Sequence, residues 1–507
     1  MSTPLSPAQP VGIVGCGAMG AGIAQIAALA GHTVRLFDAR DGAADAARGV
    51  IAQQLERLVG KARLDAAAAQ AAAQRLRVCA TLAELHDCAL VVEAIVEQLE
   101  PKRALLAALE DVVGDDCVLA SNTSSISITA LGAALRRPQR LAGMHFFNPA
   151  PVMALVEIIS GLATAPQVAQ TLHATAAAWG KTPVLARSTP GFIVNRVARP
   201  FYGEALRVRG EGGGDCATLD ALMREAGGFR MGPFELMDMI GLDINYAVTC
   251  SVWEAFYHDP RYTPSLQQRE LVDAGWLGRK RGRGFYVDGE APVPATEAPR
   301  AAPRTVAIHG DDALAQALAA RLSARGVAFE RSAAARDARV ASVDGCALHA
   351  SDGRSATARA AADGVAALAV VDLALDYARA PRLALACAET CPPQTCDAAI
   401  GLLQAAGYAV SRLADLPGLI VLRTVAMLAN EAADAVHQQV ADAAAVDRAM
   451  RLGVNYPQGP LQWADAIGVA RVREVLAHLG AFYGEDRYRI SPLIQQRACA
   501  ARALCEA

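Results

Sequence analysis

The sequence predicts an α/β protein in which a doubly wound sheet and an all-helical domain each occur twice. Three observations predict this fold: a strand-like segment leading into a glycine-rich turn near the N-terminus, an alternation of strand-like and helix-like segments behind it, and an internal repeat in the second half. A chain of 507 residues is too long for one hydrophobic core. The expected parts are a Rossmann-type sheet domain at 1–188, a helical domain at 189–287, a linker at 288–304, a degenerate sheet domain at 305–412 and a second helical copy at 413–507.

The composition excludes several classes of protein. A hydrophobic content of 53% suits a well-buried α/β protein and excludes a disordered one. The net charge of −3 provides no basic surface for nucleic acid or an anionic membrane. The N-terminus lacks a signal-peptide pattern, no long uncharged apolar span suggests a membrane helix, and the 12 cysteines lack the paired spacing of a zinc site. We therefore expect a soluble cytoplasmic protein with free thiols, no metal, and neither nucleic acid nor membrane as a partner.

A dinucleotide-binding pattern occupies the N-terminal stretch VGIVGCGAMGAGIAQIAALAGHTVRLFD. Gly15, Gly17 and Gly20 stand between a buried strand and a small-residue helix, where they allow a tight turn, close approach of a pyrophosphate and close helix packing. The helix N-terminus offers free N–H groups to the phosphates. Asp38 ends the second strand, where its carboxylate can accept hydrogen bonds from both ribose hydroxyls. This favours NAD over NADP as the cofactor, although the neighbouring Arg40 leaves NADP open.

Six more strand-like segments follow, namely LRVCA, ALVVEAI, CVLASNTSS, RLAGMHF, LVEIIS and TPVLAR. Helix-like stretches at 43–59 and 99–112 and an Ala-rich run at 66–73 separate the earlier ones. This alternation predicts a mostly parallel, Rossmann-type sheet, whose ligands bind outside the carboxyl ends of the strands. Glu93, the SNTSS segment and His145 all fall at strand ends, so we expect them on the cofactor side.

A histidine and a glutamate stand 12 residues apart in GMHFFNPAPVMALVEIIS. Oxidation of an alcohol by NAD requires a base for the hydroxyl proton, and an imidazole suits this role because its ordinary pKa lies near neutrality. Glu157 falls on the next predicted strand, where it could bind the other ring nitrogen of His145 and stabilise the imidazolium. Taken alone, the pair is as compatible with a buried structural ion pair.

Four motifs in order resemble the L-3-hydroxyacyl-CoA dehydrogenase family: SNTSS at 121–125, HFFNP at 145–149, LVEII at 155–159 and TPGFIVNRV at 189–197. GPFELMDMIGLD and GRKRGRGFYV extend the resemblance to residue 287. The resemblance implies NAD-dependent oxidation of an L-3-hydroxyacyl-CoA to a 3-oxoacyl-CoA, with an acyl-CoA thioester as the substrate. The L stereochemistry is implied by the resemblance alone.

The resemblance also implies roles for individual residues. His145 would be the general base on the 3-hydroxyl, with Glu157 as its partner. Ser124 would hydrogen-bond the substrate oxygen and the histidine, Asn195 would contact the substrate from the helical domain, and Asn148 would help to shape the pocket.

Three further residues, Glu93, Glu97 and Lys102, match family positions that line the cofactor site. Each of these roles has a structural alternative. Ser124 could cap a helix, Asn195 could satisfy backbone groups where a helix starts, and Glu97 and Lys102 could be exposed helix residues. Because the motifs match jointly, we expect the catalytic roles for the histidine, its glutamate, the serine and the asparagine.

The second half is an altered copy of the first. After the Pro-rich segment DGEAPVPATEAPRAAPR, the stretch TVAIHGDDALAQALAARLSARGVAFE repeats the strand, turn and helix, but only Gly310 remains of the glycine fingerprint. Asp311 and Asp312 would repel a pyrophosphate, so we expect no dinucleotide there. TPGFIVNRVARPFYGEAL recurs as LPGLIVLRTVAMLANEAA, with Leu422 at the position of Asn195. The sequence therefore predicts one catalytic site per chain.

In shorter members of the family two helical domains meet across a dimer interface, so we expect the second copy to pack on the first within this chain; a further homodimer is possible.

The two-copy layout resembles long bacterial members, which implies 3-hydroxybutyryl-CoA or the 3-hydroxyadipyl-CoA of phenylacetate breakdown as the substrate. Two other interpretations stay open. One is another β-hydroxyacid dehydrogenase, which would use a catalytic lysine. The other is a non-catalytic NAD-binding or structural relative.

Overall fold

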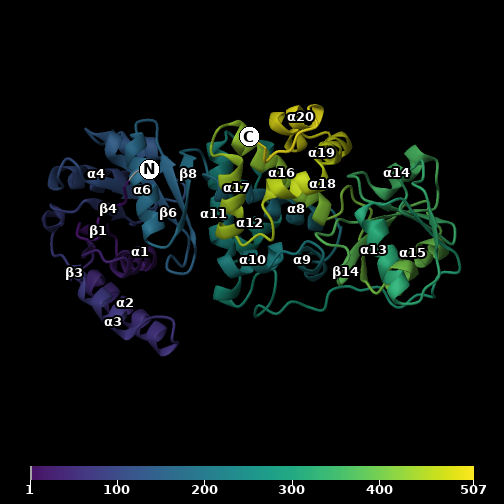
Figure 1. Cartoon of the computed structure of the whole chain (residues 1–507), viewed down its shortest axis with the longest axis horizontal. Helices are drawn as coiled ribbons and strands as arrows, with labels where there is room; N and C mark the ends of the chain where they lie inside the picture. Colours follow the sequence, from purple (N-terminus) through teal and green to yellow (C-terminus); the bar gives the residue numbers. More distant parts are fainter. Residues whose placement is uncertain (1–2, 507) are drawn as a thin grey trace. The chain divides into compact units, whose positions relative to one another are not determined.

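The computed structural model describes residues 3–506, and the chain divides into two compact units. The first unit contains the chain up to Arg196 together with residues 438–454. The second unit contains residues 197–437 and the chain from Asn455 onward. Figure 1 colours the chain along the sequence, so that the first sheet is purple to blue and the second is green.

The first unit is built on an eight-stranded sheet with the order β3-β2-β1-β4-β5-β6-β7-β8. Neighbouring strands are parallel except for β6 and β7, which run antiparallel. The interior strand residues are apolar, as expected for a sheet covered on both faces. This confirms the predicted Rossmann-type sheet. The strands are β1 (Val11–Val14), β2 (Val34–Phe37), β3 (Leu76–Val78), β4 (Leu90–Glu93), β5 (Val118–Ser121), β6 (Leu141–Phe146), β7 (Leu155–Ser160) and β8 (Thr182–Arg187).

Helices of the first unit follow the predicted alternation with the strands. In Figure 1, α2 and α3 form a pair that projects from the sheet. The helices are α1 (Ala18–Leu29), α2 (Ala43–Gly60), α3 (Ala66–Gln74), α4 (Leu99–Val112), α5 (Ile128–Gly132), α6 (Pro166–Ala178) and the short α7 (Val194–Val197), which ends at the boundary of the unit.

One more helix of this unit, α17 (Ala443–Gly453), comes from far along the chain. It falls inside the predicted second helical domain, yet it packs on β7 and β8 of the first sheet. The N–H of Arg187 donates to the carbonyl of Val440 at 2.8 Å. At Gly453 a Cβ would lie 2.8 Å from Leu155 Cδ2 and 3.0 Å from Val194 Cγ2. A glycine at this position therefore permits the close approach of α17 to the first sheet.

The second unit contains a seven-stranded sheet with the order β10-β9-β11-β12-β13-β14-β15. Unlike the first sheet, it contains a strand, β11, that runs antiparallel to both of its neighbours. The strands are β9 (Val306–His309), β10 (Glu330–Ser332), β11 (Ala341–Val343), β12 (Cys346–Ala350), β13 (Leu368–Val371), β14 (Arg382–Cys387) and β15 (Ala409–Arg412), and the helices are α13 (Ala313–Ala324), α14 (Ala356–Asp363) and α15 (Pro393–Ala405).

Both helical copies also belong to the second unit, apart from α17 and the short α7. The first copy contains α8 (Arg199–Gly210), α9 (Cys216–Glu225), α10 (Pro233–Ile240), α11 (Leu242–Ala255) and α12 (Leu266–Asp273). The second contains α16 (Val421–His437), α18 (Pro460–Ile467), α19 (Val469–Tyr483) and α20 (Pro492–Cys499). Helices α8 and α16 pack against each other. This confirms that the second copy packs on the first within one chain.

Equivalent ion pairs join the two helical copies in both directions. Arg261 of the first copy contacts Glu431 of the second at 3.0 Å, and Arg487 of the second contacts Glu204 of the first at 2.9 Å. All four side chains are buried or nearly so. The same surface of each copy thus contacts its counterpart, which is the pattern of an isologous interface between two subunits.

The expectation that every cysteine carries a free thiol is wrong for two of them. Cys387, the last residue of β14, forms a disulfide with Cys396 in the first turn of α15. Their Cα atoms lie 6.3 Å apart, within the usual range for such a bond. The other 10 cysteines are free thiols. In the described part of the chain no helix is both long and apolar enough to span a membrane.

Candidate active site

The glycine turn between β1 and α1 has the geometry that its spacing predicts. Gly15 adopts φ 93°, and a Cβ there would lie 2.6 Å from the carbonyl oxygen of Ala94. A Cβ on Gly20 would lie 1.8 Å from the carbonyl oxygen of Gly15, so this glycine allows α1 to pack directly on the turn. At Gly17 nothing lies within 4 Å of the Cβ position, and no side chain caps the helix. The first N–H groups of α1 thus face open space that could hold a phosphate.

Asp38 follows β2 directly, beside this turn. Its Oδ2 accepts a hydrogen bond from the backbone N–H of Cys16 at 2.8 Å, and Arg40 contacts its Oδ1 at 3.1 Å. Burial alone would raise the pKa of Asp38, but the hydrogen bonds from Arg40 and Cys16 lower it to about 2. The carboxylate is therefore ionised at neutral pH beside the glycine turn. A negative charge at this position disfavours a 2′-phosphate, as the sequence predicts.

Glu93 and Lys102 form a fully buried ion pair where β4 ends. The Nζ of Lys102 lies 2.6 Å from Glu93 Oε1, and the hydroxyl of Ser121 donates to Glu93 Oε2 at 2.6 Å. The N–H of Ile95 also donates to Glu93, at 2.7 Å. Lys102 is only 1% exposed, so the interpretation of this residue as an exposed helix residue is wrong. The pair fixes the segment that connects β4 to α4.

Glu97 gathers the polar groups of the SNTSS segment. Its Oε1 accepts hydrogen bonds from the hydroxyls of Thr123 at 2.7 Å and Ser125 at 3.0 Å. It also accepts from the N–H of Ser124 at 2.8 Å and from the Ser124 hydroxyl at 3.2 Å. Burial would raise the pKa of Glu97, but the hydrogen bond from Thr123 and the charge of Lys102 lower it overall. In this structure the hydroxyl of Ser124 thus faces a carboxylate rather than the histidine.

His145 and Glu157 meet across the antiparallel pair of β6 and β7, where they are direct register partners. The Nδ1 of His145 lies 2.7 Å from Oε2 of Glu157. The histidine is 5% exposed and the glutamate 0% exposed. The ring of His145 also packs against Phe147 and Phe192, with ring centroids 4.5 and 5.9 Å away. The predicted pairing of these two residues is confirmed.

The second oxygen of Glu157 holds the chain where α7 begins. Its Oε1 accepts from the N–H groups of Ile193 at 3.1 Å and Val194 at 3.0 Å. The next residue, Asn195, donates from its side chain to the carbonyl of Ser124 at 3.3 Å. One carboxylate therefore orients the histidine and also brings Asn195 and Ser124 to the same place.

Asn122 is a contributor that sequence reasoning overlooked. Its Oδ1 accepts from the N–H of Phe146 at 2.8 Å, one residue beyond His145. The bond joins the end of β5 to the end of β6. The residue stands in the SNTSS motif. The sequence alone does not show whether its side-chain amide binds the backbone or a substrate.

Asn148 lines a cavity of about 980 Å³ between α1, α2 and the loop that follows β6. The cavity wall carries Arg57, Arg63 and Lys181, and none of the described residues that line it is acidic. The Nζ of Lys181 donates to the carbonyl of Ala150 at 2.7 Å. The cavity is thus a cationic recess next to the HFFNP segment.

Comparison with known proteins identifies the family that each part of the chain matches. Residues 10–189 match the family described as "3-hydroxyacyl-CoA dehydrogenase, NAD binding domain". Residues 191–288 and again 418–504 match "3-hydroxyacyl-CoA dehydrogenase, C-terminal domain". Residues 348–417 match "3-hydroxybutyryl-CoA dehydrogenase reduced Rossmann-fold domain". The double match confirms the duplication of the helical domain, and the first match indicates NAD as the cofactor.

Three relatives show how far the similarity extends. A 3-hydroxyadipyl-CoA dehydrogenase of Escherichia coli is 42% identical over 490 residues, which are 97% of each chain. A 3-hydroxybutyryl-CoA dehydrogenase of Bradyrhizobium diazoefficiens is 41% identical over 56% of this chain and 98% of its own. The crystal structure of an Escherichia coli 3-hydroxybutyryl-CoA dehydrogenase superposes with a TM-score of 0.89, at 41% identity over 98% of this chain and 99% of that one. This chain belongs to the 3-hydroxyacyl-CoA dehydrogenase family.

Proposed function

We propose that this protein oxidises the 3-hydroxyl of an L-3-hydroxyacyl-CoA to a ketone with NAD, and also catalyses the reverse reaction. The contact between His145 and Glu157 is the observation that carries the proposal. It lies at the carboxyl end of β6, in the domain that matches an NAD-binding family. Ligands of such sheets bind at this edge.

His145 acts as the general base. Its Nδ1 is engaged by Glu157, and no residue among 3–506 hydrogen-bonds its Nε2, so Nε2 is the nitrogen that takes the hydroxyl proton. When bound, NAD accepts the hydride that leaves the same carbon. Proton uptake creates an imidazolium in a nearly water-free site, and the adjacent carboxylate stabilises that charge and keeps the ring in the correct tautomer.

Ser124 and Asn195 position the substrate oxygen. The side chain of Asn195 donates a hydrogen bond to the carbonyl of Ser124, which holds the two residues next to each other. For Ser124 to reach the substrate, its hydroxyl turns away from Glu97, while its N–H keeps the same carboxylate as its acceptor. Glu97 would thus hold the SNTSS segment in place during the reaction.

The cofactor is held by the turn at Gly15, Gly17 and Gly20 and by the carboxylate of Asp38. Glu93 and Lys102 are buried and bonded to each other, so their contribution is to fix the segment from β4 to α4 that borders the cofactor. The free N–H groups at the start of α1 receive the pyrophosphate.

The cationic cavity lined by Asn148, Arg57 and Arg63 receives phosphates of coenzyme A. The R57A/R63A double variant is expected to raise KM for the acyl-CoA about tenfold while kcat stays near that of the wild type. Phosphates of the cofactor bind elsewhere, so the Kd of NAD should not change. If the double variant instead raises the Kd of NAD, the cavity binds the cofactor rather than coenzyme A.

The acyl group is 3-hydroxyadipyl or 3-hydroxybutyryl, the groups named for the relatives of similar length. We place the reaction in the cytoplasm, where 10 free thiols would persist. The second helical copy already covers the first, so the chain supplies its own pseudo-dimer; light scattering would detect any further homodimer.

The test is NADH absorbance with purified protein, NAD and either 3-hydroxyacyl-CoA, beside a His145→Ala variant. Turnover that disappears in the variant is the expected result, and the better substrate identifies the acyl group. If the wild type binds NAD but oxidises neither thioester, the protein is a non-catalytic NAD-binding relative and the proposal fails.

A further inference from the structure

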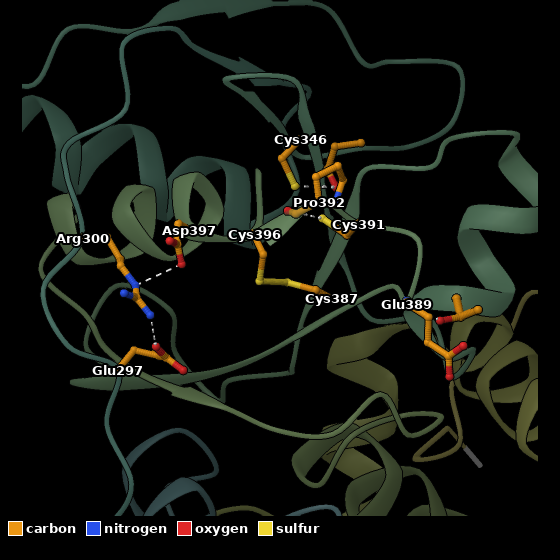
Figure 2. The surroundings of a disulfide bond; sticks show 11 residues. Glu297, Arg300, Cys346, Cys387, Glu389, Cys391, Pro392, Cys396 and Asp397 are labelled. Atoms are coloured by element: carbon orange, nitrogen blue, oxygen red, sulfur yellow. Dashed lines mark hydrogen bonds and ion pairs between the residues drawn. A yellow bond between two sulfur atoms is a disulfide. The ribbon is translucent and has the colours of Figure 1, made fainter. Parts of the chain in front are cut away.

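Four cysteines gather at one edge of the second sheet (Figure 2). Strands β12 and β13 are parallel, and β13 and β14 are antiparallel, with Ala369 opposite Cys387. The start of β12, at Cys346, and the end of β14, at Cys387, therefore lie at the same edge. Cys391 stands in the turn between β14 and α15, where its N–H donates to the carbonyl of Ala388 at 2.9 Å. This topology brings two thiols together beside the disulfide.

Cys346 and Cys391 form a thiol pair. Figure 2 shows the two side chains pointing into the same space, and each sulfur donates to a neighbouring backbone carbonyl, Cys346 to Ala347 at 3.9 Å and Cys391 to Pro392 at 3.8 Å. Cys346 is 1% exposed, whereas Cys391 is partly exposed. Solvent therefore reaches one member of the pair, and the other is buried behind it.

The pair has unequal acidity. The hydrogen bond from Cys346 lowers the pKa of Cys391 to about 7, with a further contribution from the charge of Arg412. The same hydrogen bond and burial raise the pKa of Cys346. The lowered pKa gives Cys391 more of the reactive thiolate at neutral pH than an ordinary cysteine has.

We propose that Cys346 and Cys391 are a peroxide-oxidised modification site that closes into a second disulfide. The Cys391 thiolate attacks one oxygen of hydrogen peroxide, the O–O bond breaks, and the sulfur becomes a sulfenic acid as hydroxide leaves. The Cys346 sulfur then attacks the Cys391 sulfur, the S–O bond breaks, and the departing hydroxide takes the Cys346 proton as water. Two thiols and one peroxide thus yield one disulfide and two waters.

The distribution of arginines makes this bond easy to detect. Trypsin releases Cys346 in the peptide 340–354, while Cys387, Cys391 and Cys396 all fall in the peptide 383–412. The disulfide already present joins two cysteines of one peptide. Among disulfides of these four cysteines, only one that includes Cys346 would therefore link the two peptides covalently.

The experiment treats the full-length protein with a low concentration of hydrogen peroxide, blocks the remaining thiols and analyses the unreduced tryptic digest by mass spectrometry. The linked peptides should appear in the wild type and be absent from both Cys346→Ser and Cys391→Ser variants. In C346S, Cys391 should instead collect as sulfenic and sulfinic acid. Linked peptides in C391S, or a Cys391 bonded to Cys387 or Cys396, would overturn the proposal.

A second measurement needs no variant and so does not depend on how a substitution folds. Iodoacetamide should label Cys391 on the order of tenfold faster than the more exposed Cys499 and Cys505 at pH about 7. Its labelling rate should rise through pH 7 and level off above pH about 8, because the thiolate forms as pH passes the pKa. Labelling no faster than the exposed thiols would contradict the pairing.

Discussion

The two sheet domains differ most at the end of one strand. In the first copy LAGMH ends with His145, opposite Glu157 on the next strand. In the second copy LAVVD ends with Asp372, whose N–H donates to the carbonyl of Ala384 on the next strand. Asp372 thus stands at the position of His145, and Ala384 stands at the position of Glu157. The second copy therefore lacks both members of the pair that carries the proposed chemistry.

The helix behind this site is anchored in the same way in both copies. Glu157 accepts from the N–H groups of Ile193 and Val194, and Asp372 accepts from those of Ile420 and Val421 at 3.0 and 2.7 Å. Anchoring the helix and orienting a histidine are thus separable tasks. The second copy retains the contacts that anchor the helix and lacks the histidine.

The first helix of each sheet domain shows a similar divergence. The N-terminus of α1 begins at Gly17 and carries no side-chain cap. The N-terminus of α13 is closed by Asp312, whose carboxylate accepts from the N–H of Ala315 at 2.8 Å. A capped, negatively charged helix end stabilises the fold, whereas an open one can bind a phosphate. The expectation that the second domain binds no dinucleotide is consistent with this cap.

The largest effect should come from the pair of equivalent strand-end residues. His145→Ala should lower kcat by about 10²–10⁴-fold because the general base is lost. Asp372→Ala should leave kcat near the wild-type value but lower the free energy of unfolding by about 1–3 kcal/mol, since buried N–H groups lose their acceptor. Steady-state kinetics and urea denaturation measure the two quantities. A large kcat loss in D372A would show that the second copy takes part in catalysis.

Transferring the helix cap from one copy to the other should produce the next largest effect. Gly17→Asp places a carboxylate where the pyrophosphate binds, and the Kd of NAD should rise at least about tenfold through charge repulsion. Gly49→Asp, at a glycine in α2 with open space around it, is the matched control and should leave the Kd unchanged. Titration of protein fluorescence with NAD measures both variants. Equal affinity in G17D and G49D would mean that the start of α1 does not contact the cofactor.

Exchanging the polar contact between the copies should have a smaller effect on turnover. Asn195→Leu gives the first copy the residue of the second, and kcat/KM should fall about tenfold as a hydrogen bond worth about 1.4 kcal/mol is lost. Leu422→Asn makes the opposite change at a residue that is 1% exposed. It should reduce the free energy of unfolding by about 1–3 kcal/mol without changing kinetics. An unaltered kcat/KM in N195L would remove this asparagine from the site.

The smallest effect concerns the helix that links the second copy to the first sheet. Gly453→Val forces α17 away from Leu155 and Val194, and overpacking of this kind costs about 1–3 kcal/mol. Because the N–H of Val194 is held by Glu157, a modest fall in kcat should accompany the loss of stability. Gly453→Ala should show a weaker form of both changes. A destabilised G453V with wild-type kcat would show that α17 stabilises the unit without affecting the site.

The sequence by itself determined the fold class, the cofactor turn and the duplication, and it placed His145 and Glu157 on neighbouring strands, while their catalytic pairing was implied by the resemblance to a family. These features depend on local rules: glycine spacing, alternation of apolar segments and residues that face each other on adjacent strands. The role of Asn195 stays a prediction that the resemblance of its motif implies. The altered fingerprint at Gly310 was enough to predict the divergence of the second sheet domain.

Only the tertiary structure decided which distant segments meet. It placed α17 on the first sheet, turned the hydroxyl of Ser124 toward Glu97, and buried Lys102 against Glu93. It also joined Cys387 to Cys396, for which the sequence predicts free thiols. Each of these outcomes is a contact between side chains that lie far apart in the chain or on different elements. A local sequence pattern does not say which distant side chains come into contact, because tertiary packing decides this.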